Sequence, residues 1–382
     1  MIATESKTDI LVVGGGISGL ATTWLLRRSG IDANLVEVRS RFGGRIETRT
    51  HENGAVCDLG PSWFWPGQPF VAGVLRHLEI PIHEQYAAGQ IIYQSPDGSS
   101  VNAADPSPML GALRVAGGLQ RLSDEIVARI EPEHRVLEHR VKAITRVEDR
   151  VIVTCGTVTG EVQIETQEVV LALPLRLAAQ IRFDPQLPQT CLDALLATPT
   201  WMAGHAKIFA VYAHSFWRDF GLSGTALSAR GPLTEIHDGS ASDGEGACLW
   251  GFVGLEPNAR AELGEERLLK LAVSQLADLF GPDAEAPIGM YYRDWSQETF
   301  TASDSDRVPQ RRHAEYGIQP DVGSDWRARL HFVSSETSST NGGLVEGGLT
   351  AAQRFVSRFA LSHIKGSGKT TARDANMSWD WL

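Results

Sequence analysis

The stretch from Thr8 to Gly19, TDILVVGGGISG, decides the expected fold of this chain. It begins with a short apolar run containing β-branched residues, Asp9 to Val13, which predicts a strand. Glycines follow at once, and the pattern from Leu20 to Arg28 predicts a helix. The order of strand, tight turn and helix indicates the start of a βαβ unit that binds a dinucleotide.

The glycines of this turn have the spacing of the GxGxxG fingerprint: Gly14, Gly16 and Gly19. The first permits a sharp turn, the second lets a pyrophosphate approach the backbone, and the third lets helix and strand pack closely. The helix start, with Ile17 and Ser18, would offer free N–H groups and a positive dipole to phosphates. About 20 residues further on, Glu37 closes the next apolar run, where a carboxylate would accept hydrogen bonds from ribose hydroxyls.

Two further loops follow this unit. The run from Glu37 to Arg45, EVRSRFGGR, sets a glycine pair between arginines, whose forked hydrogen bonds suit a second contact with a diphosphate. The run from Asp58 to Pro66, DLGPSWFWP, is rich in turn formers and aromatics. By itself, this second loop could simply pack on a hydrophobic core.

The composition predicts a globular protein of two domains. The chain has 382 residues, of which 42% are hydrophobic and 21% are charged. Its 35 basic and 46 acidic residues give a formal net charge of −11. Because there is no basic excess, nucleic acid and anionic membranes are not expected as main partners.

Neither metal sites nor disulfides are expected. The four cysteines lack CxxC spacing, which favours a reducing, cytoplasmic location. The N-terminus lacks the pattern of a signal peptide, and the apolar run from Ile10 to Leu26 carries four glycines, so it is interpreted as strand and helix rather than as a membrane span. The histidines form no ligand pattern and are interpreted as structural or exposed: His205, His214, His237, His313 and His331.

Hydrophobic patterns predict the remaining elements. The clearest amphipathic helix is Glu265 to Phe280. A helix at Phe70 to Leu78 and a hairpin around Pro96-Asp97-Gly98 are expected near the first third of the chain. Three short runs predict a small antiparallel meander, and a separate buried strand follows it: Val141 to Thr145, Val151 to Thr154, Val162 to Ile164, and then Val169 to Leu173. Three later runs predict strands: Lys207 to Ala213, Cys248 to Gly254 and Ile288 to Asp294.

Taken together, the N-terminal motifs resemble the flavin-containing amine oxidase family, the group of monoamine and polyamine oxidases. The family pattern is a GxGxxG turn, Glu-x-Arg, a Gly-Gly-Arg loop, and Asp-x-Gly before an aromatic loop, and all four occur here in order. The resemblance implies FAD rather than NAD. It also implies an α/β fold in which a Rossmann-like FAD-binding domain carries a discontinuous α+β substrate domain.

The resemblance suggests domain boundaries that composition does not mark. The FAD-binding domain is expected at residues 1–69, 114–182 and 324–365. The substrate domain would take residues 70–113 and 183–323, and residues 366–382 would form a polar tail.

A closing motif near the C-terminus also resembles the family. Ser334-Ser335-Glu336-Thr337 follows a predicted strand, and Gly342 to Gly348 leads into a helix expected from about Leu344 to Ala360. A helix N-terminus at this place would stabilise the negative charge that a flavin gains on reduction. Serines stand where the family usually has Ala-Gly before the glutamate.

The resemblance implies a set of FAD contacts drawn from both ends of the chain. They are Gly14, Gly16, Ile17, Ser18, Gly19, Glu37, Val38, Arg39, Gly43, Gly44, Arg45, Gly60, Pro61, Ser62, Trp63, Val141, Trp295, Glu336, Leu344 and Val345. Val141 would lie beside the adenine end, which is compatible with a position in the core of a strand. Trp295 would lie near the flavin ring, with a core position as the alternative. No cysteine stands near Ser303 or Asp304, where the family attaches flavin covalently, so FAD is expected to be bound non-covalently.

Lys207 is the candidate catalytic residue. It stands inside an apolar strand, which is unusual because lysines are rarely buried unless paired. It matches a family lysine that holds a water near the flavin and helps oxygen to react with the reduced ring. The alternative is a solvent-facing lysine on an edge strand.

The largest departure from the family concerns the two aromatics that flank the amine in monoamine oxidases. Ser305 and Leu344 stand at the corresponding positions. A cage would therefore need substitutes from elsewhere: Trp63, Phe64, Trp65 or Tyr292.

The resemblance implies an FAD-dependent oxidoreductase of the amine oxidase type. A hydride would pass from a C–N substrate to flavin N5, and oxygen would reoxidise the flavin and give hydrogen peroxide. The expected partners are a small-molecule amine and molecular oxygen. Two alternatives stay open: a flavin dehydrogenase or desaturase acting on C–C bonds of an apolar substrate, and a non-catalytic flavoprotein.

Overall fold

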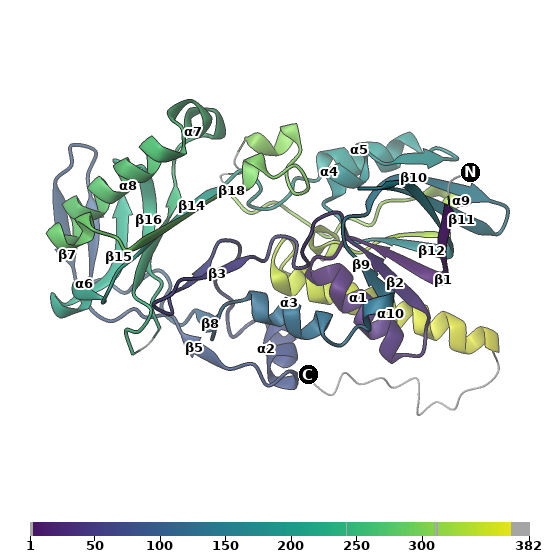
Figure 1. Cartoon of the computed structure of the whole chain (residues 1–382), viewed down its shortest axis with the longest axis horizontal. Coiled ribbons are helices and arrows are strands. Elements are labelled where there is room, and N and C mark those ends of the chain that lie inside the picture. The colour runs from purple at the N-terminus through teal and green to yellow at the C-terminus, as the bar shows by residue number, and fades with distance from the viewer. Residues whose placement is uncertain (1–2, 242, 309, 311, 368–382) are drawn as a thin grey trace.

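An eight-stranded sheet is built around β1 (Ala3–Val13), as Figure 1 shows for this computed structural model, which describes residues 3–241, 243–308, 310 and 312–367. The strand order is β13-β10-β11-β12-β1-β2-β9, with β19 (Leu330–Phe332) paired to β12. Strand β1 and β2 (Ala33–Val36) run parallel and are joined by helix α1 (Ile17–Arg28), which confirms the predicted βαβ start. The other strands are β9 (Arg135–Val136), β10 (Arg140–Val147), β11 (Arg150–Thr157), β12 (Gly160–Leu171) and β13 (Arg182–Asp184).

The end of the predicted meander and the separate strand after it form one continuous element, so the prediction of two strands was wrong. Strand β12 pairs antiparallel with β11 in its first half and parallel with β19 in its last residues, while β1 runs along nearly all of it. The polar residues from Glu165 to Glu168 interrupt the hydrophobic pattern, which is why the sequence predicted two strands instead of one. Its threonine, Thr166, is buried and donates to the carbonyls of Asp9 and Glu168, which satisfies the hydroxyl within the sheet.

Helices cover both faces of this sheet (Figure 1). Helices α1, α3 (Gln120–Val127) and α10 (Val345–Ser367) share one hydrophobic core with α2 (Pro69–His77). On the other face pack α4 (Leu175–Ala178), α5 (Gln189–Ala197) and α9 (Gly323–Trp326). Helices α2 and α5 fall within the ranges predicted for the substrate domain, yet they pack around the first sheet; the other boundaries stay a prediction.

A seven-stranded, mostly antiparallel sheet forms the second part, in the order β18-β14-β17-β16-β15-β6-β7. Its strands are β6 (Gln90–Gln94), β7 (Ser100–Ala103), β14 (Ala206–Val211), β15 (Leu222–Ser228), β16 (Leu233–Asp238), β17 (Cys248–Val253) and β18 (Gly289–Asp294). The predicted early hairpin is confirmed as β6 and β7, and it joins this sheet through β15. The predicted amphipathic helix, α8 (Glu265–Phe280), covers one face, beside α6 (Phe216–Asp219) and α7 (Pro257–Leu263).

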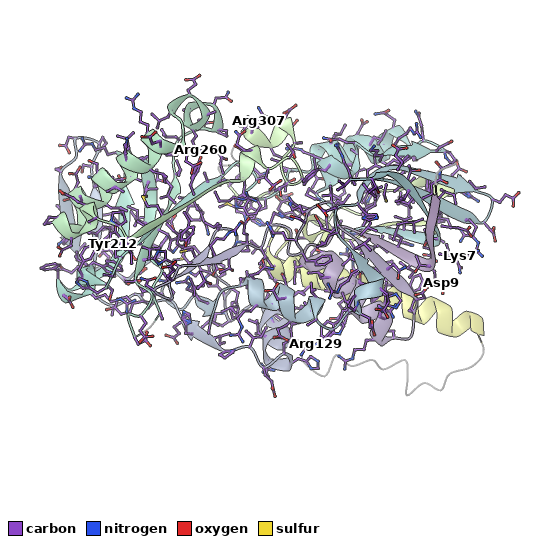
Figure 2. All side chains as sticks on the ribbon, in the orientation of Figure 1. Lys7, Asp9, Arg129, Tyr212, Arg260 and Arg307 are labelled. Atoms are coloured by element: carbon purple, nitrogen blue, oxygen red, sulfur yellow. The ribbon has the colours of Figure 1, made fainter. Side chains whose placement is uncertain are left out.

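Side chains of β14 alternate between the two faces of the second sheet. Ile208 packs in the core beneath α8, whereas Phe209 packs with Leu59 on the opposite face. Lys207 shares the face of Phe209, because side chains two residues apart in a strand point the same way. This face lies toward the first sheet, since Lys207 lines one cavity together with Gly14 at the end of β1, and side chains from both parts extend into the region between the sheets (Figure 2).

Shorter elements complete the chain. Two small sheets pair β3 (Thr48–Thr50) with β4 (Val56–Asp58) and β5 (Ile82–Glu84) with β8 (Leu113–Val115). The 3₁₀ turns are η1 (Pro132–His134), η2 (Pro282–Glu285), η3 (Trp295–Gln297), η4 (Asp304–Arg307) and η5 (Ser335–Thr337). Of the predicted tail, residues 366 and 367 end α10 and the others lie outside the described residues. None of the helices that the structure describes has the length and apolar character needed to cross a membrane.

Candidate active site

A cavity of about 480 Å³ lies between the two sheets. On one side it is lined by residues that directly follow parallel strands of the first sheet: Gly14 after β1, Glu37 after β2, Ala172 after β12. On the other side it is lined by Lys207 of β14 and Phe252 of β17. Ligands of open parallel sheets bind outside the carboxyl ends of the strands, so this cavity is the candidate site.

Most residues of the predicted FAD site line this one cavity. They are Gly14, Gly16, Ile17, Ser18, Glu37, Val38, Arg39, Gly43, Gly44, Arg45, Gly60, Pro61, Ser62, Trp63, Trp295, Leu344 and Val345, together with Lys207. The fold therefore gathers segments from the two ends of the chain around one space. Their individual contacts with a cofactor stay a prediction.

Three predicted residues do not line the cavity. Gly19 acts in packing, since a Cβ added there would lie 1.8 Å from the carbonyl oxygen of Gly14. Val141 packs against the core of the first sheet, which fits the core alternative, and its contact with the adenine end stays a prediction. Glu336 is fully buried behind the cavity wall, where it pairs with Arg45.

The glycine turn has the geometry that its sequence predicts. Gly14 has a φ of +107°, and a Cβ there would lie 2.6 Å from the carbonyl oxygen of Ala172. At Gly44 a Cβ would lie 3.0 Å from the Cα of Gly16, so the two glycine loops pack backbone against backbone at the cavity edge. Helix α1 starts there without a side-chain cap, which leaves its first N–H groups available to an anion.

Glu37 and Arg39 supply charge on the side of the cavity where the glycine turn lies, and their contacts with a nucleotide stay a prediction. The Glu37 carboxylate accepts hydrogen bonds from the backbone N–H of Gly15 at 2.6 Å and of Arg39 at 2.9 Å, which holds it in place. The Arg39 guanidinium donates to Thr301 Oγ1 at 2.9 Å. Its buried Nε has no hydrogen-bond partner among the described residues, so it fits an acceptor such as a phosphate oxygen.

Arg45 joins the two ends of the chain. Its Nη1 lies 2.8 Å from Glu336 Oε1, and its Nη2 donates to Ser335 Oγ at 2.8 Å. The glutamate is buried, so this ion pair holds the Gly-Gly-Arg loop against the closing motif. Ser335, one of the two serines that depart from the family pattern, thus forms a hydrogen bond with Arg45.

Lys207 is buried on β14, an inner strand that pairs with β17 on one side and with the edge strand β18 on the other, so the edge-strand alternative is wrong. Its Nζ donates to Ser62 Oγ at 2.8 Å and to the carbonyl oxygens of Asp58 and Gly60 at 3.2 and 2.5 Å. The ring of Trp250 lies 4.2 Å from the same nitrogen. Burial lowers the pKa of Lys207 to about 7, although the nearby Asp58 acts in the opposite direction.

Trp295 is a core residue that also reaches the cavity wall, and its place near the flavin ring stays a prediction. It is buried, its Nε1 donates to the carbonyl oxygen of Leu59 at 2.9 Å, and it also lines the cavity. The Arg293 guanidinium carbon lies 4.7 Å from the centre of the ring. The tryptophan therefore forms a fixed part of the wall.

Two of the four suggested cage substitutes line the cavity, Trp63 and Trp65. Phe64 is buried in the core of the first sheet instead, and Tyr292 packs with the core under α8. Ser305 lines a separate hollow, which shares only the segment around Met202 to His205 with the main cavity.

Several lining residues were missed at the level of sequence, above all Trp201, His205, Phe252, Phe300 and His313. The interpretation of His205 and His313 as structural or exposed was therefore incomplete. Trp201 and His313 contact each other with ring centroids 4.5 Å apart, although loops more than a hundred positions apart carry them. No local pattern signals such a pair. Trp65 and His313 are exposed, so the cavity opens beside them.

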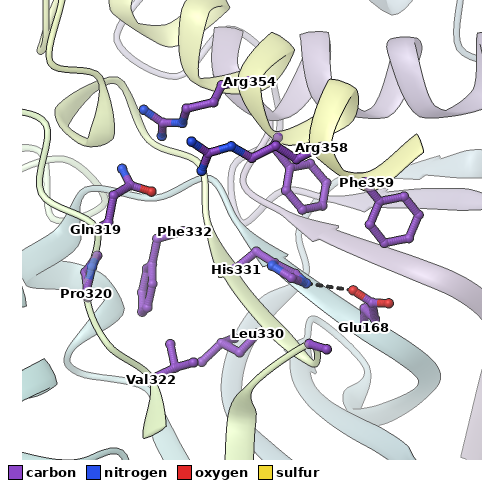
Figure 3. A pocket seen from close by; sticks show the side chains of 12 residues that line it. Glu168, Gln319, Pro320, Val322, Leu330, His331, Phe332, Arg354, Arg358 and Phe359 are labelled. Carbon is purple, nitrogen blue, oxygen red and sulfur yellow. Dashed lines mark hydrogen bonds and ion pairs between the residues drawn. The ribbon is translucent and has the colours of Figure 1, made fainter. Parts of the chain in front are cut away.

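A smaller hollow lies between α10 and the segment before β19 (Figure 3). His331 Nε2 contacts Glu168 Oε2 at 2.6 Å there, and the guanidinium groups of Arg354 and Arg358 lie at its upper side. None of the predicted site residues lines it. No group of potential metal ligands occurs among the described residues.

The main cavity fits FAD on structural grounds. It offers uncapped helix N–H groups, the unpaired Arg39 Nε and a fixed carboxylate for the nucleotide, and a long aromatic wall for a flat ring system. All four cysteines are free and buried, and none is among the lining residues that the structure describes, so this wall offers no thiol for a covalent bond to flavin.

Comparison with known proteins matches these features to characterised families. Residues 85–358 match the family model described as flavin containing amine oxidoreductase, and residues 12–78 match a model described as NAD(P)-binding Rossmann-like domain. The chain is 23% identical to putrescine oxidase of Kocuria rosea, over 92% of this chain and 95% of the relative. It is also 23% identical to amine oxidase [flavin-containing] B of Sus scrofa, over 92% of this chain and 85% of the relative.

Solved structures share the fold. Wild-type putrescine oxidase bound to putrescine superposes with a TM-score of 0.77 at 23% identity, covering 93% of this chain and 100% of the other. Cyclohexylamine oxidase from Brevibacterium oxydans IH-35A superposes with a TM-score of 0.78 at 19% identity, covering 93% and 99%. The amine oxidoreductase model alone spans well over half of the sequence. The chain therefore belongs to the family of flavin containing amine oxidoreductases, and it is an FAD-dependent oxidoreductase.

Proposed function

We propose that this protein is an amine oxidase that uses molecular oxygen and releases hydrogen peroxide. The observation that carries the proposal is the burial of Lys207, which lines the same cavity as the residues that are predicted to bind FAD. FAD would be held by the N-terminus of α1, Arg39 and the Gly-Gly-Arg loop, and it would supply the capacity to accept a hydride from the carbon next to the amine nitrogen and to return the electrons to oxygen.

The residues of the chain would act by placing the amine and excluding water. Trp63, Phe252 and Trp295 provide apolar walls, and a dry, preorganised pocket aligns the reacting C–H bond. No side-chain base is assigned, because a neutral amine needs none for hydride loss. When it is protonated, Lys207 places a positive charge at the wall, where it favours the negative charge that develops as oxygen is reduced.

The charges of the cavity favour a monoamine with an apolar body. Among the described lining residues Glu37 is the one carboxylate, and backbone N–H groups already hold it at the nucleotide end. A second ammonium group would therefore lose its hydration without gaining an acidic partner. This argues for cyclohexylamine-like or benzylamine-like substrates over diamines such as putrescine.

An anaerobic screen tests the proposal. The FAD-loaded protein is mixed without oxygen with benzylamine, cyclohexylamine and putrescine, and bleaching of the flavin is followed. Bleaching by the two monoamines, then peroxide formation on admitting air, is the expected result. A second set of apolar compounds without an amine group is tested in the same way. Bleaching only by a compound of this second set would support C–C dehydrogenation instead, and no bleaching by any compound would favour a non-catalytic flavoprotein.

The role of Lys207 has its own test. In Lys207→Met we expect FAD to be retained and reoxidation of the reduced protein by oxygen to slow by about tenfold or more below pH 7, because the amine and the charge that it carries when protonated are removed. Stopped-flow mixing of the reduced protein with oxygen measures the rate. A rate equal to that of the unchanged protein would remove Lys207 from the oxygen reaction.

A further inference from the structure

Trp63 contributes an aromatic wall to the cavity, and its ring is held from several sides. The indole packs edge-on against His237, with ring centroids 4.8 Å apart, and at a tilt against Trp250, at 4.9 Å. Trp250 also lies beneath the Lys207 nitrogen. The orientation of Trp63 therefore bears on the same part of the cavity as Lys207.

A single buried side chain, Gln85, binds the polar edge of this indole. Trp63 Nε1 donates to Gln85 Oε1 at 2.8 Å. The amide nitrogen of Gln85 donates to the carbonyl oxygens of Tyr86 at 3.1 Å and Asp238 at 2.7 Å. Because carbonyls only accept and the indole N–H only donates, the network allows one orientation of this amide.

The acceptors of Gln85 are themselves fixed. The Asp238 carboxylate accepts from Trp217 Nε1 at 2.8 Å and from Arg218 Nε at 2.7 Å. The same arginine lies over the ring of Tyr86, at 3.7 Å from its centre. The end of β16 and the segment after β5 thus form a rigid frame behind Gln85.

From this network we infer that Gln85 is a positioning residue for the proposed reaction: it turns the indole N–H of Trp63 away from the cavity, so that an apolar ring face meets the substrate. The inference rests on the proposed function for its kinetic consequence. The geometry of the indole itself is independent of that function. Without the acceptor, this part-buried N–H would be left unpaired, and the ring would gain by rotating toward another partner.

Three variants and a control test this role. Gln85→Leu removes the acceptor, Trp63→Phe removes the donor while keeping a ring, and the double variant removes both. Gln94→Leu is the matched control, because Gln94 is as buried as Gln85 and accepts a bond from Ser228 Oγ at 2.7 Å, but does not line the cavity. All four are compared with the unchanged protein in the FAD-loaded form.

The kinetic readout is the separation of KM from kcat for benzylamine. We expect Gln85→Leu to raise KM about five- to tenfold, the size of one lost buried hydrogen bond, with kcat changed less than twofold. The effects of Gln85→Leu and Trp63→Phe should not multiply in the double variant, because both break the same contact. Equal losses in the Gln94→Leu control, or independent effects in the double variant, would overturn the inference.

A second readout does not depend on turnover. Crystal structures of the FAD-loaded unchanged protein and of FAD-loaded Gln85→Leu are compared. In Gln85→Leu we expect the Trp63 indole to be rotated relative to its orientation in the unchanged protein, while the backbone around it stays in place. An indole that keeps its orientation would overturn the inference even if KM changed. A rotated indole in a protein that oxidises no amine would instead leave the positioning intact and refute the proposed function.

Discussion

At the scale of single residues, Lys207 shows how burial changes chemistry. Its ammonium group has three acceptors and an aromatic ring around it, yet the loss of hydration dominates and lowers its pKa from the usual 10.5 to about 7. The unfolded chain therefore binds a proton between these two pH values that the folded chain does not. The stability of the fold should rise with pH across that range and level off above it.

The expected increase of stability with pH gives a prediction for the FAD-free protein. The free energy of unfolding is measured in urea between pH 6 and pH 9.5 for the unchanged protein and for Lys207→Met. As the pH rises above 7, the value for the unchanged protein should increase relative to that for Lys207→Met, because methionine does not titrate. Taking the difference between the two proteins removes the contribution of every other group. Two curves that stay parallel over the whole range would show that Lys207 remains charged in the fold.

At the scale of elements, the turn between β1 and α1 depends on contacts that leave no space for a side chain. The Cβ of an alanine at position 19 would meet the carbonyl oxygen of Gly14 at 1.8 Å, well inside any van der Waals contact. Because both partners are backbone, neither can rotate away. Strand and helix would have to separate at the point where the dinucleotide is expected to bind.

Gly19→Ala should therefore destabilise the fold by about 3 kcal/mol or more and weaken FAD binding. Gly67→Ala is the control, since a Cβ there meets no atom within 4 Å and the residue has no positive φ; it should stay within about 0.5 kcal/mol of the unchanged protein. Thermal unfolding with and without FAD measures both. Similar melting temperatures for the two variants would contradict the close packing of strand and helix.

At the scale of the whole molecule, the cavity is built by segments that lie far apart in the chain. The ion pair of Arg45 with Glu336 joins the first fifty residues to the closing motif, and Lys207 joins the second sheet to the loop at Asp58 to Ser62. A cofactor that contacts all these segments would stabilise the folded state as a unit, by about 2.7 kcal/mol when its concentration is 100 times its Kd.

Removal of FAD should therefore lower the melting temperature, and Arg45→Met should reduce the gain that added FAD restores. The control is Arg49→Met, because the Arg49 side chain is 60% exposed and does not line the cavity. The double variant Arg45→Met/Glu336→Gln separates the cost of an unpaired buried glutamate from the loss of a cofactor contact. A full FAD response in Arg45→Met would exclude this arginine from the cofactor site.

Local signals predicted the elements well. The helix at Glu265 to Phe280 and the hairpin of β6 and β7 follow from periodicity and turn residues, and both are confirmed. The polar middle of β12 misled the same reasoning, because its hydroxyl and charged groups find partners only once the sheet forms. The alternation of polar and apolar residues could not predict whether Lys207 is buried, because its burial depends on which strands pair with β14 on either side.

By itself, the sequence determined the glycine turn, the acid after β2 and the Gly-Gly-Arg loop, because these features depend on neighbouring residues and on backbone sterics. Only the tertiary structure decided which aromatic side chains line the cavity. Trp63 lines it while its neighbour Phe64 packs in the core, and Trp201 meets His313 from a distant loop. Which side chains line the cavity depends on how the two sheets pack against each other. The spacing of residues along the chain does not encode this packing, because it joins segments that are far apart in the sequence.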